Sequence, residues 1–336
     1  MTQPAPDPET DDGEEFEEDL RSRSGAMSVV QLVLLVVAFL IIARAVAHID
    51  LEDLADELRD ANWWLVALGM VVAQAPRPTA ALSSMGASPV PIRFLPMYLL
   101  QLALSYIGLV VPGSAARFAV NVRFFQRTGM PAGTAVAASA LDSAVWFAVL
   151  GALLGGMLLF TSSTLEVDFD SSTSSGLSRL LLVVIVLGLV ALVAVGAVPR
   201  WRAAVVARIR QFAADAREAT RGVMSPSRIS MLLGGNLATA LLFAAALGIF
   251  GAALGHPISF LDALFIHVSV ALLAGVLPVP GGIGVVEAGL TFGLARTGIP
   301  EDAAFAIAIL FRIATFYLPP AWGVFALRWL ERNRHL

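Results

Sequence analysis

The sequence predicts an all-α, polytopic membrane protein with about six full spans and two broken or re-entrant helical hairpins in an inverted repeat. Three observations carry this prediction. The 336-residue chain is 57% hydrophobic and only 14% charged, whereas soluble globular proteins carry about 25% charged residues. Several apolar runs reach the roughly 20 residues that a membrane-spanning helix needs. Two further apolar regions are interrupted by Pro-Gly and share a sequence pattern.

The composition excludes several kinds of site. The chain has no cysteine, so disulfides and thiolate metal sites are impossible. Its four histidines are scattered, without the H-E-x-x-H spacing of a zinc site. We therefore expect no cofactor and no bound metal. No nucleic-acid partner is expected either, and the modest net charge of −4 comes largely from one acidic tail.

The chain divides into a tail, one membrane domain and a short end. Residues 1–26 are rich in Pro, Asp and Glu and are predicted to be a disordered cytoplasmic tail. Residues 27–330 are predicted to form a single transmembrane domain, and residues 331–336 a cytoplasmic tail. The predicted simple spans are 27–47, 63–82, 131–160, 180–198, 229–255 and 303–327.

Arginines are concentrated just before the first span, in residues 200–228 and after the last span. Because basic residues in short loops favour the cytoplasmic side, both termini are predicted to be cytoplasmic, and the acidic loop 161–176 lies outside. This assignment requires segment 92–127 to enter and leave from the cytoplasm, and segment 261–295 to enter and leave from outside. Whether their arms cross the membrane fully or stop midway stays open.

These two broken segments share a pattern. The first reads VVPGSAARFAVNVRFFQRTGMP (110–131), and the second PVPGGIGVVEAGLTFGLARTGIP (278–300). In each, Pro-Gly is followed 15 or 16 positions later by Arg-Thr-Gly-x-Pro, and the next span carries a charged residue. Duplication explains this agreement better than chance. With opposite entry sides the copies form an inverted repeat, a transporter architecture whose substrate site lies at the repeat interface.

Glu287 is the leading site candidate, because ionisable residues at membrane depth are costly and mark functional sites by default. Its carboxylate could bind a cation or a polar headgroup beside the second break. Alternatively, it caps the helix that begins after Gly284 by accepting backbone N–H groups. The neighbouring Pro280, Gly281 and Gly282, together with Gly284, could let a headgroup approach the backbone or could serve tight helix packing.

The first break offers Pro112, Gly113, Arg117 and Asn121 as candidate substrate-binding residues. Arg117 could attract a lipid phosphate, for which the forked donors of arginine suit bidentate contact. Alternatively, its side chain could extend to the membrane interface. The two interpretations are evenly balanced on the sequence alone.

Further candidates lie on the spans. Asp142 and Arg312 occupy matching positions in the two copies and have opposite charge. A buried ion pair between the copies is the preferred interpretation, and direct substrate contact is the alternative. Arg77 lies between two prolines, where a structural role is slightly favoured over a substrate contact. Asn236 is expected to hydrogen-bond between helices rather than to bind a ligand.

The stretches PVPGGIGVVEAGL (278–290) and ILFRIATFYLPPAWG (309–323) resemble the flippase-like membrane family that includes the transmembrane region of lysylphosphatidylglycerol synthases. That family shows a P-G-G-x-G-x-x-E-A motif late in the chain and a span with an Arg followed by Pro and Gly. The resemblance covers roughly residues 27–330. At the first break the family usually has P-G-x-x-G-E, where this chain has Ala116 and Arg117. The matching residues here are Pro280, Gly281, Gly282, Gly284, Glu287, Ala288, Arg312, Pro319 and Gly323.

The resemblance implies lipid translocation, or support of a lipid-linked pathway of the cell envelope, in the cytoplasmic membrane. The expected ligand is a membrane lipid, either anionic or lipid-linked. Nine residues follow the predicted last span, so the aminoacyl-transferase domain of the synthases is not expected here. The chain is accordingly not expected to be an enzyme.

Other classes of function stay open at this point. A non-catalytic membrane partner could recruit an envelope glycosyltransferase or lipid synthase through the basic segment 200–228. A small-solute transporter would suit an inverted repeat equally well. An intramembrane enzyme is disfavoured, because the sequence has no Ser/His, H-E-x-x-H or paired-carboxylate constellation.

Overall fold

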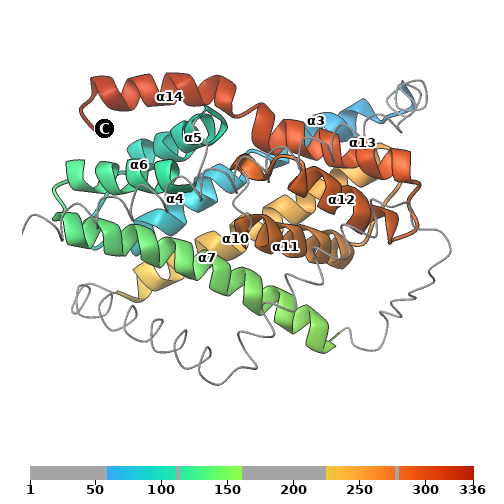
Figure 1. Ribbon diagram of the computed structural model, residues 1–336, viewed down its shortest axis with the longest axis horizontal. Helices are drawn as coiled ribbons and strands as arrows, with labels where there is room; N and C mark the ends of the chain where they lie inside the picture. Colours follow the sequence, from blue (N-terminus) through green and yellow to red (C-terminus); the bar gives the residue numbers. More distant parts are fainter. Residues whose placement is uncertain (1–58, 111–113, 161–224, 277–279) are drawn as a thin grey trace, which may run out of the picture.

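The computed structural model describes residues 59–110, 114–160, 225–276 and 280–336. These ranges contain helices and no strand, so the predicted all-α class is confirmed for them (Figure 1). The predicted tail 1–26, the spans 27–47 and 180–198, most of the basic segment 200–228, and the pair Pro112 and Gly113 lie outside the described residues.

Within each described range the helices are separated by short turns, and two irregular turns interrupt the second half of the chain. These are the 3₁₀ turn η1 (Pro280–Gly282) and the π-helical turn η2 (Ile313–Tyr317). The helices are α3 (Trp63–Val72), α4 (Pro76–Ala87), α5 (Phe94–Val110), α6 (Ser114–Arg127), α7 (Ala132–Phe160), α10 (Pro226–Ala253), α11 (Phe260–Val276), α12 (Val285–Ala295), α13 (Glu301–Arg312) and α14 (Pro320–Arg332).

Within the described ranges, four segments are long and apolar enough to cross a membrane. They are Trp63–Ala87, Ala132–Leu158, Pro226–Ala253 and Glu301–Arg332. Each overlaps one of the predicted simple spans, and the two remaining predicted spans lie outside the described residues. The chain is therefore a multi-pass membrane protein.

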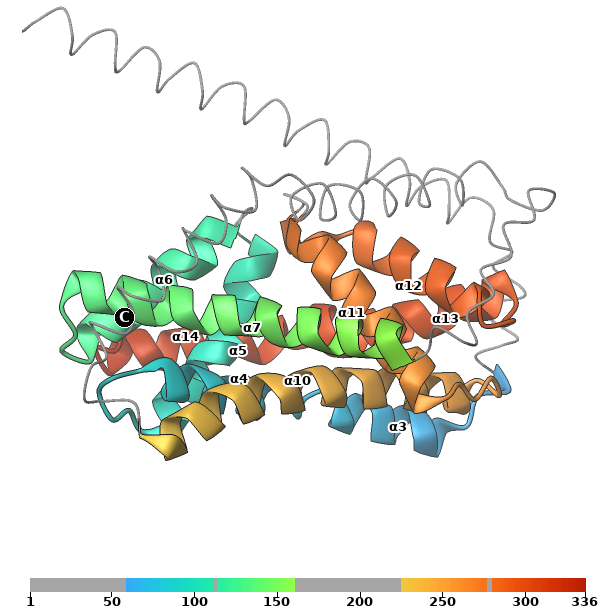
Figure 2. The ribbon, with the colours of Figure 1, turned by 90° about the horizontal axis from the view of Figure 1, so that it is seen from below.

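Each predicted broken segment is a pair of short helices, α5 with α6 and α11 with α12. Helix α12 has 11 residues, which is about 16 Å at 1.5 Å per residue and roughly half of the ~30 Å hydrocarbon core. This arm is therefore too short to cross the membrane by itself. Helix α5 contacts η1, so the first pair lies against the break of the second. Figure 2 shows the arrangement of the two pairs. The inverted orientation of the two pairs stays a prediction.

The repeated Arg-Thr-Gly-x-Pro motif forms the same turn in both copies. The hydroxyls of Thr128 and Thr297 each donate to the backbone carbonyl three residues earlier, at 2.7 Å. Gly129 and Gly298 follow with φ values of +94° and +92°, which glycine adopts without strain at the end of a helix. The proline then leads into α7 or α13. The motif is thus a helix stop joined to a helix start.

The last span was predicted as a simple helix, and the structure shows that it is broken. The N–H of Leu318 donates to the carbonyl of Ile313, five residues earlier, at 2.8 Å, which is the π-helical pattern. Pro319 and Pro320 have no N–H and cannot continue the helical ladder. Helix α7, the matching span of the first copy, contains no proline and is continuous.

Helices α4 and α10 pack with their backbones in close contact. A Cβ atom on Gly86 would lie 2.4 Å from the backbone nitrogen of Leu232, and one on Gly235 would lie 2.6 Å from that of Ser83. Small residues at such positions are typical of helix packing in membranes. Gly323 has the same role between α14 and α5, where an added Cβ would lie 2.5 Å from a backbone oxygen.

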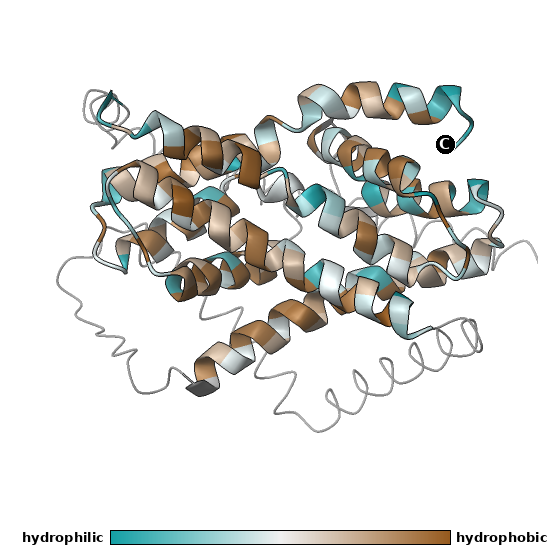
Figure 3. Cartoon of the chain, turned by 180° about the vertical axis from the view of Figure 1, so that it is seen from behind, coloured by the Kyte–Doolittle hydropathy of each residue, from teal (hydrophilic) through white to brown (hydrophobic). Residues whose placement is uncertain are grey.

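The outer surface of the helices is apolar. Trp63, Trp64 and Val71 on α3 and Leu261 on α11 are exposed. Figure 3 colours many residues along the helices as hydrophobic, whereas the C-terminal end of α14 is coloured hydrophilic. An apolar outer surface suits contact with lipid, and aromatic residues such as the two tryptophans are enriched where a helix meets the membrane interface.

Candidate functional site

The break of the second hairpin is built from glycines whose backbone no other residue type would adopt easily. Gly281 has φ +62°, and Gly282 and Gly284 also have positive φ values. A Cβ atom on Gly281 would lie 2.3 Å from the ring of Phe316. The glycines therefore have two functions here, since they turn the chain and let an aromatic ring from the broken last span lie against the turn.

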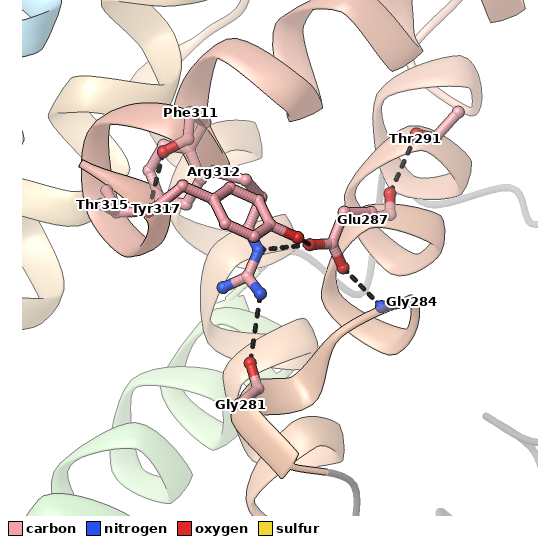
Figure 4. Close-up of polar contacts among 8 residues, drawn as sticks. All are labelled: Gly281, Gly284, Glu287, Thr291, Phe311, Arg312, Thr315 and Tyr317. Atoms are coloured by element: carbon pink, nitrogen blue, oxygen red, sulfur yellow. Dashed lines mark hydrogen bonds and ion pairs between the residues drawn. The ribbon is translucent and has the colours of Figure 1, made fainter. Parts of the chain in front are cut away.

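Glu287 lies in the first turn of α12, and its carboxylate is buried at the centre of this break (Figure 4). Oε2 accepts the backbone N–H of Gly284 at 2.7 Å. Oε1 accepts from Nε of Arg312 at 2.7 Å and from the hydroxyl of Tyr317 at 3.0 Å. The helix-capping interpretation of Glu287 is confirmed, and the carboxylate also has a buried ion pair that the cap alone does not require.

Arg312 ties the two broken elements together. It is 5% exposed, as is Glu287. Besides the ion pair, its Nη2 donates to the carbonyl of Gly281 at 3.1 Å, and its guanidinium carbon lies 4.1 Å from the centroid of the Phe316 ring. Among the described residues, the structure records no partner for Nη1. The guanidinium is thus held on three sides and retains one donor group.

Tyr317 was not identified from the sequence, and the reason is geometric. On a regular α-helix, residues three or four apart share a face, so a tyrosine five positions after Arg312 would point elsewhere. The π-helical turn adds a residue to the turn and brings the Tyr317 hydroxyl to the carboxylate of Glu287. The adjacent Pro319 and Pro320 were the only sequence signal that the helix is irregular there.

Arg77 and Gln74 bind the open backbone of the broken last span. The carbonyl of Thr315 lacks a helical donor, because the residue four positions later is Pro319. Nη2 of Arg77 donates to this carbonyl at 2.6 Å, and Nε2 of Gln74 donates to the carbonyl of Ala314 at 2.8 Å. Side chains at the break between α3 and α4 therefore donate to the unpaired carbonyls at the break between α13 and α14, which supports the structural interpretation of Arg77.

Replacing Arg77 by alanine is expected to lower the free energy of unfolding by about 1–3 kcal/mol, the usual range for a buried group left without its hydrogen bond. The change removes the donor to Thr315, whose carbonyl then has no replacement in the membrane. Thermal unfolding in detergent, followed by tryptophan fluorescence, measures the effect.

Arg93→Ala is the matched control for this variant, because Arg93 is exposed. The control should unfold like the wild type. Equal stability of Arg77→Ala and Arg93→Ala would contradict the assignment of Arg77 as the cap.

The predicted ion pair between Asp142 and Arg312 is wrong. Asp142 accepts from the hydroxyls of Ser83 and Ser84 on α4, and Arg312 pairs with Glu287. The matching sequence positions do not place the two charges together, because the span of Arg312 is broken one residue after it and the span of Asp142 is continuous. The prediction that Asn236 links helices is confirmed, since its Nδ2 donates to Ser83 Oγ at 2.6 Å.

Arg117 and Asn121, the described polar candidates near the first break, form no recorded hydrogen bond with the site around Glu287 and Arg312. The side chain of Arg117 lies against α5, where a Cβ atom on Gly108 would be 3.1 Å from its Cδ. Arg117 is exposed on α6, and the structure records no hydrogen-bond partner for it among the described residues. Asn121 has a buried Oδ1 that lacks a partner within the described part of the chain. A substrate role for Arg117 or Asn121 stays a prediction.

Together, these residues place charged groups at the helix breaks of an apolar protein, with Glu287 and Arg312 buried and Arg117 exposed. Arg117, Arg77 and Arg312 supply positive charge, and Glu287 balances one of them through a direct ion pair. Such a set suits an anionic group, because guanidinium donors favour carboxylate and phosphate oxygens. No cluster of three or more His, Cys, Asp or Glu side chains that could hold a metal ion occurs in the described residues.

Comparisons with known proteins give one match. The model of the family described as the lysylphosphatidylglycerol synthase TM region matches residues 29–323, which include both hairpins and the site around Glu287. In those synthases this region is the non-catalytic membrane domain. No curated protein matches the chain significantly, and no solved structure does either. The chain belongs to the family of the lysylphosphatidylglycerol synthase transmembrane region, a family of membrane proteins with lipid-related function.

Proposed function

We propose that this protein moves a polar-headed, anionic or lipid-linked membrane lipid between the leaflets of the cytoplasmic membrane, with both termini in the cytoplasm. The observation that carries the proposal is the gathering of arginines at helix breaks in an otherwise apolar protein. Charged residues at membrane depth are costly and are found where a ligand or ion passes. Family membership and the short, broken hairpins support the same function.

The arginines are connected through the structure. Arg77 donates to the carbonyl of Thr315, three residues after Arg312, which pairs with Glu287. An anionic headgroup near Arg117 or Arg77 would be attracted by the positive charge, since opposite charges within a few ångströms attract strongly where water is scarce. Nη1 of Arg312, for which the described residues provide no recorded partner, offers a further donor. The lipid tails would remain against the apolar outer surface of the helices while the headgroup passes.

Arg117 gives the sharpest test, because the described residues contain no hydrogen-bond partner for it and its loss should leave the fold intact. Purified protein is placed in vesicles that contain a headgroup-labelled phosphatidylglycerol or a labelled zwitterionic lipid, and an impermeant quencher reports lipid movement. Wild type should move the anionic probe several-fold faster than empty vesicles. Arg117→Gln should slow it by at least about tenfold, since a hydrogen bond to a charged group contributes about 1.5–3 kcal/mol.

Arg93→Gln makes the same substitution at an exposed position of the chain and should keep the wild-type rate. A well-folded wild-type protein that moves none of a panel of anionic, aminoacylated and lipid-linked probes would contradict the proposal. That outcome would favour the alternative of a non-catalytic partner of an envelope lipid synthase or glycosyltransferase.

A further inference from the structure

A second polar cluster lies apart from the arginines, between α4, α7 and α10. Both carboxylate oxygens of Asp142 accept hydrogen bonds, Oδ1 from Ser83 and Oδ2 from Ser84, the latter at 2.6 Å. Each serine oxygen in turn accepts an amide donor, Ser83 from Asn236 at 2.6 Å and Ser84 from Gln101 at 3.1 Å. Asn236 Nδ2 also donates to Oδ1 at 3.5 Å, so every partner recorded for the carboxylate in the described part of the chain is a neutral group.

Within the described residues, no positively charged side chain pairs with Asp142. The charged or titratable side chains on the elements packed against α7 are Arg77 on α4, Arg228 on α10, His267 and Asp262 on α11, and Arg117, Arg123 and Arg127 on α6. Asp142 forms no hydrogen bond or ion pair with any of them in the described part of the chain. This contrasts with Glu287, whose carboxylate has Arg312 as a direct counter-ion.

We propose that Asp142 is a proton-binding site that takes up and releases one proton during the working cycle of the protein. An ionised carboxylate without a counter-ion is costly at membrane depth, and one proton changes the charge of the site from −1 to zero. The cluster binds a proton rather than a metal ion, because its oxygens are in direct hydrogen-bond contact. The 2.6 Å contact between Ser84 Oγ and Oδ2 is a hydrogen bond, so a proton already lies between these two oxygens.

Proton uptake would change how three helices are held together. The ionised carboxylate only accepts hydrogen bonds, whereas the protonated one donates one and accepts fewer. When Oδ2 receives a proton, the Asp142 O–H can donate to Ser84 Oγ, and the Ser84 hydroxyl must turn to another acceptor. Since Ser83 and Ser84 belong to α4, this event alters the contact of α7 with α4, and Asn236 of α10 is linked to it through Ser83. This link to movement rests on the proposed lipid transport; the proton site itself does not.

Infrared spectroscopy of the full-length protein in lipid nanodiscs tests the site directly. Between about pH 5.5 and 8.5, exposed aspartates remain ionised because their usual pKa is about 3.9. Wild type should show the carbonyl band of a protonated carboxylic acid that grows as pH falls through this window. Asp142→Asn should lose this pH-dependent band, and Asp262→Asn, a change at an exposed carboxylate, should retain it.

A band that is unchanged in Asp142→Asn, or that is constant across the window in wild type, would overturn the proposal. Ser84→Ala serves as a second variant if Asp142→Asn does not fold. It keeps the carboxylate but removes one donor to its ionised form, so the band should appear at higher pH. A wild-type-like titration of Ser84→Ala would likewise count against the site.

Lipid movement under an imposed pH gradient tests the link to transport. The gradient should change the wild-type rate several-fold and leave the rate of Asp142→Asn unaffected. A wild-type rate that does not change with the pH gradient would overturn the proposed link between proton binding and lipid transport. Absence of any lipid movement by wild type would contradict the proposed function, while the infrared band would still decide the proton site.

Discussion

Replacing Glu287 by glutamine is expected to lower the free energy of unfolding by about 3–5 kcal/mol, the usual effect of removing one partner of a buried ion pair. The change preserves the shape of the side chain but leaves the positive charge of Arg312 buried without a counter-ion. It also weakens the acceptor for the N–H of Gly284 and the hydroxyl of Tyr317. Thermal unfolding of the purified protein in detergent measures the loss.

Glu301→Gln is the matched control, since Glu301 is exposed in the first turn of α13. It should change stability by only a few tenths of a kcal/mol, as surface substitutions usually do. The double variant Glu287→Gln with Arg312→Met completes a mutant cycle, and it should be more stable than the sum of the single changes predicts because no charge is left unpaired. A loss for Glu287→Gln no larger than that for Glu301→Gln would show that the ion pair does not stabilise the hairpin.

Gly235→Leu should prevent α4 and α10 from packing, and we expect little folded protein to be recovered. A Cβ atom at this position would lie 2.6 Å from the nitrogen of Ser83 and 2.7 Å from the oxygen of Thr79. Both are backbone atoms of α4, so no side-chain rotation can relieve the overlap. Overpacking a core commonly costs about 1–3 kcal/mol. Because the whole helix must move here, we expect a cost at or above the upper end of that range.

Gly234→Leu provides an internal control one position earlier on α10. Nothing lies within 4 Å of a Cβ atom at Gly234, and leucine suits an apolar helix surface. This variant should elute from size-exclusion chromatography as one symmetric peak and unfold near the wild-type temperature. If Gly235→Leu behaved in the same way, the close backbone contact between α4 and α10 would be refuted.

The spans could be predicted because hydropathy alone determines them. A run of about 20 apolar residues can satisfy its backbone in lipid only as a helix, which is why the predicted spans within the described residues overlap the four long apolar segments. The break of the second hairpin could also be predicted, since Pro280 and the neighbouring glycines indicate it directly. Glu287 could be identified as a site candidate for a related reason, because a single carboxylate in an apolar run is unusual.

The partners of these residues could not be predicted, because partner choice depends on local irregularities of the helix. The expectation that Asp142 meets Arg312 assumed two continuous spans with the same geometry. The π-helical turn after Arg312 changes which side chains face the hairpin and brings Tyr317 to Glu287. Ser83 and Ser84 carried little signal, since short hydroxyl residues occur throughout membrane helices, and only the structure shows that they face the carboxylate of Asp142.

The capped carbonyls at the broken last span have a consequence for any movement of the protein. Gln74 and Arg77 from one broken span replace the two backbone donors that the other lacks. Separating the spans would expose the oxygens of Ala314 and Thr315 in hydrocarbon, and each bare polar group costs about 2–7 kcal/mol. Any state in which these two broken spans separate must therefore admit water to the carbonyls of Ala314 and Thr315. We expect the junction to become hydrated whenever the spans move apart.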